Sequence, residues 1–305
     1  MRHPFRHHRP FRDLDTGLWA SAHWIWDRRG AAKANAFPFG EETITQTVLL
    51  DLAAELRGSV HIVPFSKPVE GRTGADWEWC LYDRAANRYL RFLVQAKVLD
   101  DHDRLYDEID RFIGTSTIRQ IDRLRATSAF RRVPALYVFY NHLDDPTQVP
   151  VGHCPCGPCL ECWGASVAAL DAVYPIVMGT PRDKSFDTLR HVSVPWRCLL
   201  CAADGRGPRR DPIDGALAGL HRLADRASEG YPDAPRADIP PMPDAPERDP
   251  PDYLGFLLDR AADGPSIGID ARSREALAAD NPGVDGVVLV DATRAATPDR
   301  GLRIG

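Results

Sequence analysis

The strongest constraint on the fold is a run of strand-like segments in the first half of the chain. In Asp76-Trp77-Glu78-Trp79, polar and aromatic residues alternate, which is the period of an extended strand and not of a helix. In a strand, the two carboxylates share one face and the two indoles share the other. Because neighbouring like charges repel each other, the pattern calls for a cation beside the two acids.

Similar patterns lie on both sides of this segment. Residues 59–67 and 89–99 read as further strands, and residues 133–143 read as a fourth. Apolar residues recur at helical spacing over residues 41–56 and 105–129. The order helix, three strands, helix, strand predicts an α/β core of about one hundred residues.

Composition divides the 305-residue chain into four predicted regions. Residues 1–40 form a basic and aromatic N-terminal arm, 41–145 the α/β core, and 146–205 a cysteine-rich insertion. Residues 206–305 contain helical segments, a proline-rich linker and a terminal strand over 285–294. For the arm, a solvated extension and a nucleic-acid-binding segment both remain open.

Charge and hydropathy limit the classes of protein. A net charge of −5 gives no global basic signature, so any contact with nucleic acid depends on a local patch. We expect no membrane span, because no run of about 18 apolar residues occurs. The basic start of the chain lacks the apolar core of a secretory signal, which indicates a cytoplasmic protein.

The cation that the acids require is found in the third strand segment. Gln95 and Lys97 are two residues apart and therefore share a face. An acid on one strand and a lysine on its neighbour are what a metal-dependent phosphodiesterase needs. Carboxylate oxygens hold a hard divalent cation such as Mg²⁺ or Mn²⁺. The cation polarises the phosphate and activates a water, and the lysine offsets the developing charge.

These residues, in this order, resemble the restriction-endonuclease-like PD-(D/E)XK nuclease superfamily. Asp76 in the second strand and Gln95-Ala96-Lys97 in the third resemble its Mrr-type branch, in which Gln replaces the acid before the lysine. The segments EET, TGADWEW, QAK and PALYVFYN also resemble an uncharacterised bacterial group associated with anti-phage defence. The resemblance covers residues 41–141 and implies an αβββαβ core with a mixed central sheet flanked by helices.

The resemblance also implies roles for individual residues. Asp76 and a Glu of the first core helix, Glu42 or its neighbour Glu41, would hold the metal. Gln95 would position the metal or the water, and Lys97 would assist the attack. Two departures matter: no proline precedes Asp76, and Gln95 contributes no negative charge. Glu78 can compensate as a ligand or can be a surface acid beside the site. For Asp76 and Lys97 the alternative is a cross-strand salt bridge on a solvated face.

Arginines near the second predicted helix provide the local basic patch. Arg119 and Arg123 are one helical turn apart, with Arg125, Arg131 and Arg132 nearby. They are candidates for DNA phosphate contacts that carry no sequence information. A solvated helix face is the alternative.

The cysteines indicate a second metal. Six of the seven cysteines occur in two groups, which are Cys154, Cys156, Cys159 and Cys162, and then Cys198 and Cys201. Two C-x-x-C pairs can present four thiolates to one tetrahedral ion, which favours structural Zn²⁺ held by Cys159, Cys162, Cys198 and Cys201. His153 and the remaining thiols are alternative ligands, and an Fe–S cluster is an alternative metal group. Cys80 is expected to be a small buried hydrophobe.

The sequence thus predicts a Mg²⁺-dependent endonuclease that acts on DNA, with a zinc-binding insertion and a role in phage defence. It could act as a homodimer or with a partner defence protein. The alternative is a catalytically inactive protein of the same fold that serves as an interaction or nucleic-acid-binding module. A third reading is a nuclease that is active only after a partner or a nucleotide signal.

Overall fold

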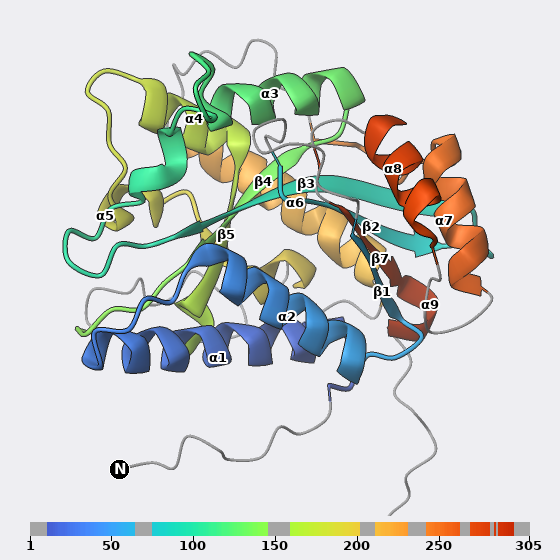
Figure 1. Cartoon of the computed structure of the whole chain (residues 1–305), viewed down its shortest axis with the longest axis horizontal. Coiled ribbons are helices and arrows are strands. Elements are labelled where there is room, and N and C mark those ends of the chain that lie inside the picture. The colour runs from blue at the N-terminus through green and yellow to red at the C-terminus, as the bar shows by residue number, and fades with distance from the viewer. Residues whose placement is uncertain are drawn as a thin grey trace, which may run out of the picture.

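A seven-stranded sheet lies between two layers of helices in the computed structural model (Figure 1). The structure describes residues 11–64, 75–145, 159–201, 211–230, 242–262, 269–280, 284 and 286–295. The strands are β1 (Val60–Pro64), β2 (Trp77–Asp83), β3 (Arg88–Val98), β4 (Ala135–Tyr140), β5 (Ala165–Ala169), β6 (Val194–Pro195) and β7 (Gly286–Asp291).

The helices come from the whole length of the chain. The α-helices are α1 (Leu14–Ala34), α2 (Glu41–Glu55), α3 (Gln120–Arg131), α4 (Leu170–Met178), α5 (Phe186–Leu189), α6 (Pro212–Gly230), α7 (Asp252–Ala262), α8 (Ala271–Asp280) and α9 (Ala292–Ala295). Short 3-10 helices are η1 (Asp107–Asp110), η3 (Glu161–Gly164) and η4 (Trp196–Leu200). Within the part of the chain that the structure describes, no helix is both long and apolar enough to cross a membrane.

The sheet is mixed, with the strand order β1-β7-β2-β3-β4-β5-β6. β2 runs antiparallel to β3, and β3 runs parallel to β4. The late strand β7 lies between β1 and β2, antiparallel to β1 and parallel to β2. The start of β2 therefore lies beside the ends of β3 and β4, and this end of the strands carries the candidate site.

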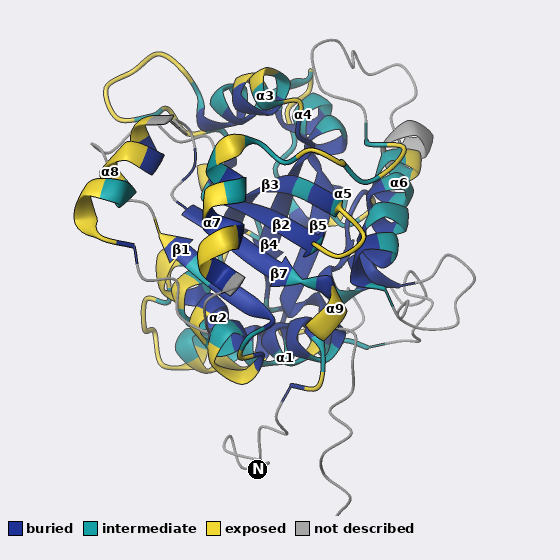
Figure 2. Cartoon of the chain, turned by 90° about the vertical axis from the view of Figure 1, so that its right-hand side faces the viewer, coloured by how far each residue is buried: buried dark blue, intermediate teal, exposed yellow. Residues whose placement is uncertain are grey.

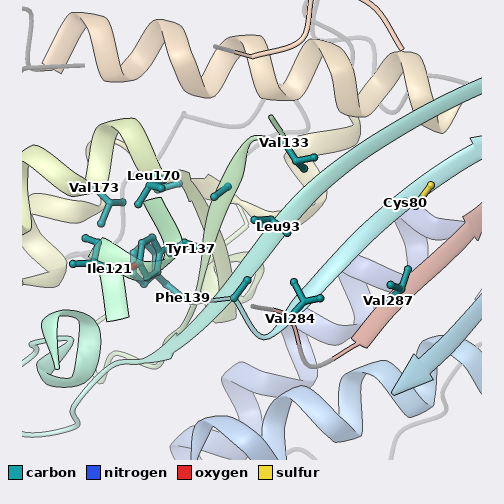
Figure 3. Close-up of a cluster of buried hydrophobic side chains, with 14 of the residues drawn as sticks. Cys80, Leu93, Ile121, Val133, Tyr137, Phe139, Leu170, Val173, Val284 and Val287 are labelled. Carbon is teal, nitrogen blue, oxygen red and sulfur yellow. The ribbon is translucent and has the colours of Figure 1, made fainter. Parts of the chain in front are cut away.

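Side chains alternate between the two faces of the sheet, and each face has its own core. On the first face, Leu93, Tyr137 and Phe139 lie near Ile121 of α3 and Leu170 and Val173 of α4 (Figure 3). Residues of α7 and α8 belong to the same core. On the second, Trp79 and Phe92 pack with α1, α2 and α6. The strands are almost wholly buried, and exposed residues lie on the outer sides of the helices and in the loops (Figure 2).

The predicted α/β class and the mixed sheet between helices are confirmed, but the N-terminal arm is not a free extension. In residues 1–40, α1 is a long helix whose Leu18 and Ile25 are buried in the second core. Its start is fixed by Asp13, whose carboxylate accepts a hydrogen bond of 2.8 Å from the Thr16 amide. Tryptophans and basic residues in the sequence pattern obscured this apolar stripe.

Two further segments differ from the sequence prediction. The helix expected over 105–129 is interrupted: Phe112 and Arg119 form a β-bridge around Gly114, whose φ of +51° suits glycine, and α3 begins at Gln120. In the predicted insertion, β5 and β6 extend the sheet beyond β4. The described residues of the predicted insertion are therefore part of the same sheet.

Candidate functional site

Asp76 lies at the start of β2, where its carboxylate is held by β3. The Gln95 side-chain amide donates to both carboxylate oxygens at 3.0 and 2.9 Å, and the Ala96 amide donates to Oδ2 at 2.8 Å. The Asp76 amide itself donates to the Val94 carbonyl, which ties the residue into the sheet. The strand pairing therefore fixes the position and orientation of this carboxylate.

Lys97 joins the same end of the sheet to α2. Its side chain is only 1% exposed, and its ammonium lies 3.2 Å from a carboxylate oxygen of Glu41. Glu41 is the first residue of α2, where the partial positive charge of the helix terminus favours an acid. The cluster of Glu41, Asp76, Gln95 and Lys97, here called the acid–lysine cluster, thus combines one helix terminus with two strands.

The acid–lysine cluster carries two carboxylates against one ammonium. Burial raises the pKa of Glu41 from 4.5 to about 7, and the charge of Asp76 acts in the same direction, while Lys97 opposes it. Burial also raises the pKa of Asp76, against the opposing effects of Lys97, the Ala96 amide and Gln95. Both acids are therefore less ionised than in water, and a bound cation would favour their ionised forms.

Two buried polar atoms beside the acid–lysine cluster lack a hydrogen-bond partner among the described residues. They are the Tyr137 hydroxyl and Oε1 of Gln120. Gln120 is connected to the cluster because its amide donates to Oε1 of Gln95 at 3.0 Å. Tyr137 is the β4 neighbour of Gln95 in the sheet register, and the charges of Asp76 and Glu41 act on its hydroxyl. Such orphaned groups mark a place for an ordered water or a ligand.

The hydrogen bonds of Gln95 define its role in this arrangement. Its amide nitrogen donates to Asp76 and its oxygen accepts from Gln120, so both ends of the side chain are occupied. Gln95 therefore positions the Asp76 carboxylate, and its oxygen is not available to a metal in this arrangement. The donors that remain for a divalent cation are the carboxylates of Glu41 and Asp76, which are the hard oxygen ligands that Mg²⁺ and Mn²⁺ prefer.

Two predicted site residues lie elsewhere. Glu42 is exposed, and its carboxylate accepts a hydrogen bond of 3.2 Å from Gln46 on the next turn of α2. Glu41, which the sequence offered as the alternative, is the acid that reaches Lys97. Glu78 is on the predicted face of β2, yet its partners are different from those of Asp76.

Glu78 forms the centre of a second buried charged cluster. Its side chain is fully buried, with Arg131 at 2.5 Å, Arg91 at 3.3 Å and the Tyr253 hydroxyl at 2.6 Å. Arg91 also binds Glu247 at 2.9 Å. We call these residues the Glu78 cluster. It connects β2 and β3 to α3, to α7 and to the segment before α7, and its two acids and two arginines balance in charge.

The arginines near α3 are largely engaged within the protein. Arg119 binds Asp110 at 3.1 Å, Arg125 stacks over the Tyr174 ring at 4.6 Å, and Arg131 belongs to the Glu78 cluster. These contacts weaken the prediction of a phosphate-binding patch on this helix. Arg111 is the better placed residue, because it is exposed and its charge acts on both Glu41 and Asp76.

The cysteine-rich segment contains a group that could hold a metal, with a composition different from the expected one. The group consists of His23 on α1 with Cys159 and Cys162, which flank the start of η3. Cys159 and Cys162 form a disulfide in the structure. Cys198 and Cys201 are buried in η4 and at its end, and they are not members of this group. Cys154 and Cys156 lie outside the described residues. Cys80 is a buried free thiol, as predicted.

Comparison with known proteins gives a family without an assigned activity. The model of a family of unknown function, DUF6615, matches residues 14–294. The chain belongs to this family. No curated protein matches the sequence and no solved structure matches the fold. The DUF6615 match spans α1 to α9, so it includes the acid–lysine cluster, the Glu78 cluster and the His–Cys group together.

Several members of these clusters could not be found from sequence. Gln120 and Tyr137 carry no local signal, because glutamine at a helix start and tyrosine in a strand are common in any α/β protein. His23 is 136 residues away from Cys159. The family resemblance implies an acid at the start of the first core helix, for which Glu42 was the first candidate and Glu41 its neighbour.

Proposed function

We propose that this DUF6615 chain is a Mg²⁺- or Mn²⁺-dependent nuclease that hydrolyses phosphodiester bonds of DNA. The acid–lysine cluster is the observation that carries the proposal. Two carboxylates with raised pKa values, a buried lysine and two orphaned polar atoms converge where three strands and the starts of two helices meet. Buried acids whose pKa values stay raised although Lys97 and Arg111 oppose the shift are typical of functional sites.

The residues divide the chemistry among themselves. Glu41 and Asp76 would hold the divalent cation, which polarises the phosphate and lowers the pKa of the attacking water when bound. Gln95 and the Ala96 amide keep the Asp76 carboxylate in place. Lys97 holds Glu41 in the free protein and is available to stabilise negative charge on the phosphate once the acids bind a cation.

The restriction-endonuclease-like core and the phage-defence role are parts of the same proposal. The order of β2, β3, α3 and β4, with α2 before them, supports the core. β5 extends it beyond β4, and β7 is inserted between its first two strands, β1 and β2. We further propose a cytoplasmic enzyme that works as a homodimer or with a partner defence protein, and a cysteine-rich segment that contains structural zinc.

A cleavage assay tests the proposed activity. Plasmid, linear and single-stranded DNA and RNA are incubated with the protein in Mg²⁺ or Mn²⁺. We expect cleavage by the wild type, loss in Glu41→Gln and Asp76→Asn, and retention in the matched control Glu42→Gln. Absence of cleavage together with absence of Mn²⁺ binding, or full activity in Asp76→Asn, would contradict the proposal.

A catalytically inactive interaction module is the second candidate. The observation that favours it is the Lys97–Glu41 ion pair, which already compensates one of the two acids without a metal. Titration with Mn²⁺ separates the two functions. An inactive module would bind no divalent ion at the carboxylates, whereas a nuclease that needs an activating partner would still bind one.

A further inference from the structure

The distances from the His23 ring to the sulfurs of Cys159 and Cys162 match those between ligands of one tetrahedral ion. The His23 Nε2 atom lies 3.3 Å from the Cys159 sulfur and 3.8 Å from the Cys162 sulfur. With Zn–S bonds of about 2.3 Å and Zn–N bonds of about 2.0 Å, a tetrahedral site separates nitrogen and sulfur by about 3.5 Å. The two observed nitrogen–sulfur distances lie on either side of this value.

The position of His23 is fixed by direct packing of α1 on η3. A Cβ atom at Gly164 would collide with the Ala22 carbonyl and lie 2.8 Å from the Trp26 amide nitrogen. Only glycine permits this approach, which places the Ala22–Trp26 turn of α1 against the cysteine pair. The Trp19 ring, one turn earlier on α1, packs against His23 in a tilted arrangement with 4.1 Å between ring centroids. The imidazole is therefore held in place before any ion binds.

We propose that His23 is a zinc ligand, which together with the Cys159 and Cys162 thiolates binds one Zn²⁺ when the pair is reduced. This inference specifies the ligands of the proposed structural zinc and does not depend on nuclease activity. A thiol reductant converts the disulfide into two thiols and is itself oxidised to a disulfide. Zinc binding then releases the two thiol protons to solvent, and the sulfurs separate to about 3.8 Å.

The ligand types select the metal. One imidazole and two thiolates suit Zn²⁺ and suit Mg²⁺ or Ca²⁺ poorly, since these take oxygen ligands. The site connects α1 to the start of η3, and water or another ligand takes the fourth position. Zinc would therefore fasten the N-terminal helix to the cysteine-rich segment, in a place where the sequence predicted a free arm.

Metal analysis of the full chain tests the ligand set. The protein is purified in a phosphine reductant, loaded with Zn²⁺ and dialysed, and its zinc content and affinity are measured. An Asp76→Asn background excludes zinc held at the acid–lysine cluster. We expect one zinc per chain, and an affinity at least about 100-fold lower in His23→Ala, since loss of an outer-shell partner alone costs 10–100-fold.

Three further variants make the test decisive. His23→Cys should restore zinc binding, because a third thiolate replaces the imidazole. His23→Asn keeps the approximate size and polarity of the residue but removes the imidazole ligand. It should fold and lose zinc, and it therefore replaces His23→Ala if that variant does not fold. Cys201→Ser, at a buried cysteine outside the group, should keep zinc binding. Full zinc content in both His23→Ala and His23→Asn, loss of zinc in Cys201→Ser, or no zinc in the reduced wild type would overturn the assignment.

Discussion

Two buried charged clusters lie on the same face of the sheet. Asp76 of the acid–lysine cluster is only two residues before Glu78 of the Glu78 cluster. In the Glu78 cluster, two arginines and a tyrosine hydroxyl satisfy a fully buried carboxylate. In the acid–lysine cluster, two carboxylates have raised pKa values although Lys97 and the nearby Arg111 oppose the shift, and two neighbouring polar atoms have no partner among the described residues. Fully paired acids are typical of a structural ion-pair cluster, whereas buried acids with raised pKa values beside orphaned groups are typical of a binding site.

The largest expected effect is on catalysis. Lys97→Ala and Asp76→Asn should each lower the rate of Mg²⁺-dependent DNA cleavage by about 10³-fold, because each removes a charge that stabilises the transition state by several kcal/mol. Their circular dichroism spectra should match the wild type. A cleavage rate within about threefold of wild type in either variant would place catalysis elsewhere.

The next effect is on stability and concerns the Glu78 cluster. Glu78→Gln leaves Arg91 and Arg131 without their buried partner, so the free energy of unfolding should fall by about 3–5 kcal/mol. Urea denaturation at pH 7.5 measures it, with Glu42→Gln on the exposed turn of α2 as the control, expected within about 0.5 kcal/mol of wild type. A loss below about 1 kcal/mol in Glu78→Gln would show that this cluster does not stabilise the fold.

For Glu41, in contrast to Glu78, replacement of the acid should increase the free energy of unfolding. Its pKa is about 7 in the folded chain and 4.5 without its environment, so the folded state binds more protons between these values. The free energy of unfolding should therefore fall as pH rises from 4.5 to 7, by about 1–3 kcal/mol. Glu41→Gln should make this slope shallower, with Asp76 contributing the remainder, and should be more stable than wild type at pH 7.5. Denaturation at several pH values measures it, and an unchanged slope in the variant would refute the assignment.

The last comparison concerns two tyrosines, one in each region. Tyr253→Phe removes a hydrogen bond to the Glu78 carboxylate and should destabilise the chain by about 1.5–3 kcal/mol. Tyr137→Phe removes a buried hydroxyl without a described partner, and its free energy of unfolding should stay within about 1 kcal/mol of wild type or rise. Thermal and urea unfolding of the pair measures both, and equal losses would erase the distinction between the clusters.

The strand periodicity predicted much of this arrangement. Alternation in β2 and β3 correctly placed Glu78 opposite the indoles and put Gln95 and Lys97 on a common face. Alternation predicts which side chains share a face of a strand. It does not predict how far along the strand a partner from another element lies, so it cannot separate Glu78 from Asp76. The partners that separate them, Glu247 and Tyr253, come from the end of the chain, and no local pattern connects them to β2.

The sequence alone does not predict which of two neighbouring helix residues faces the site. Successive helical residues point about 100° apart, so the rotation of α2 against the sheet decides between Glu41 and Glu42. The same applies to His23, whose role depends on how closely α1 approaches Gly164. These are properties of tertiary packing, and the acids of the first turn of α2 look equivalent without it.

The most direct measurement of the central claim is Mn²⁺ binding by titration calorimetry, with the zinc site already filled. The account predicts one additional divalent ion per chain in the wild type, lost in Asp76→Asn, at least tenfold weaker in Glu41→Gln, and unchanged in Tyr253→Phe of the Glu78 cluster. No Mn²⁺ binding by the wild type, or equal binding by Asp76→Asn, would contradict it.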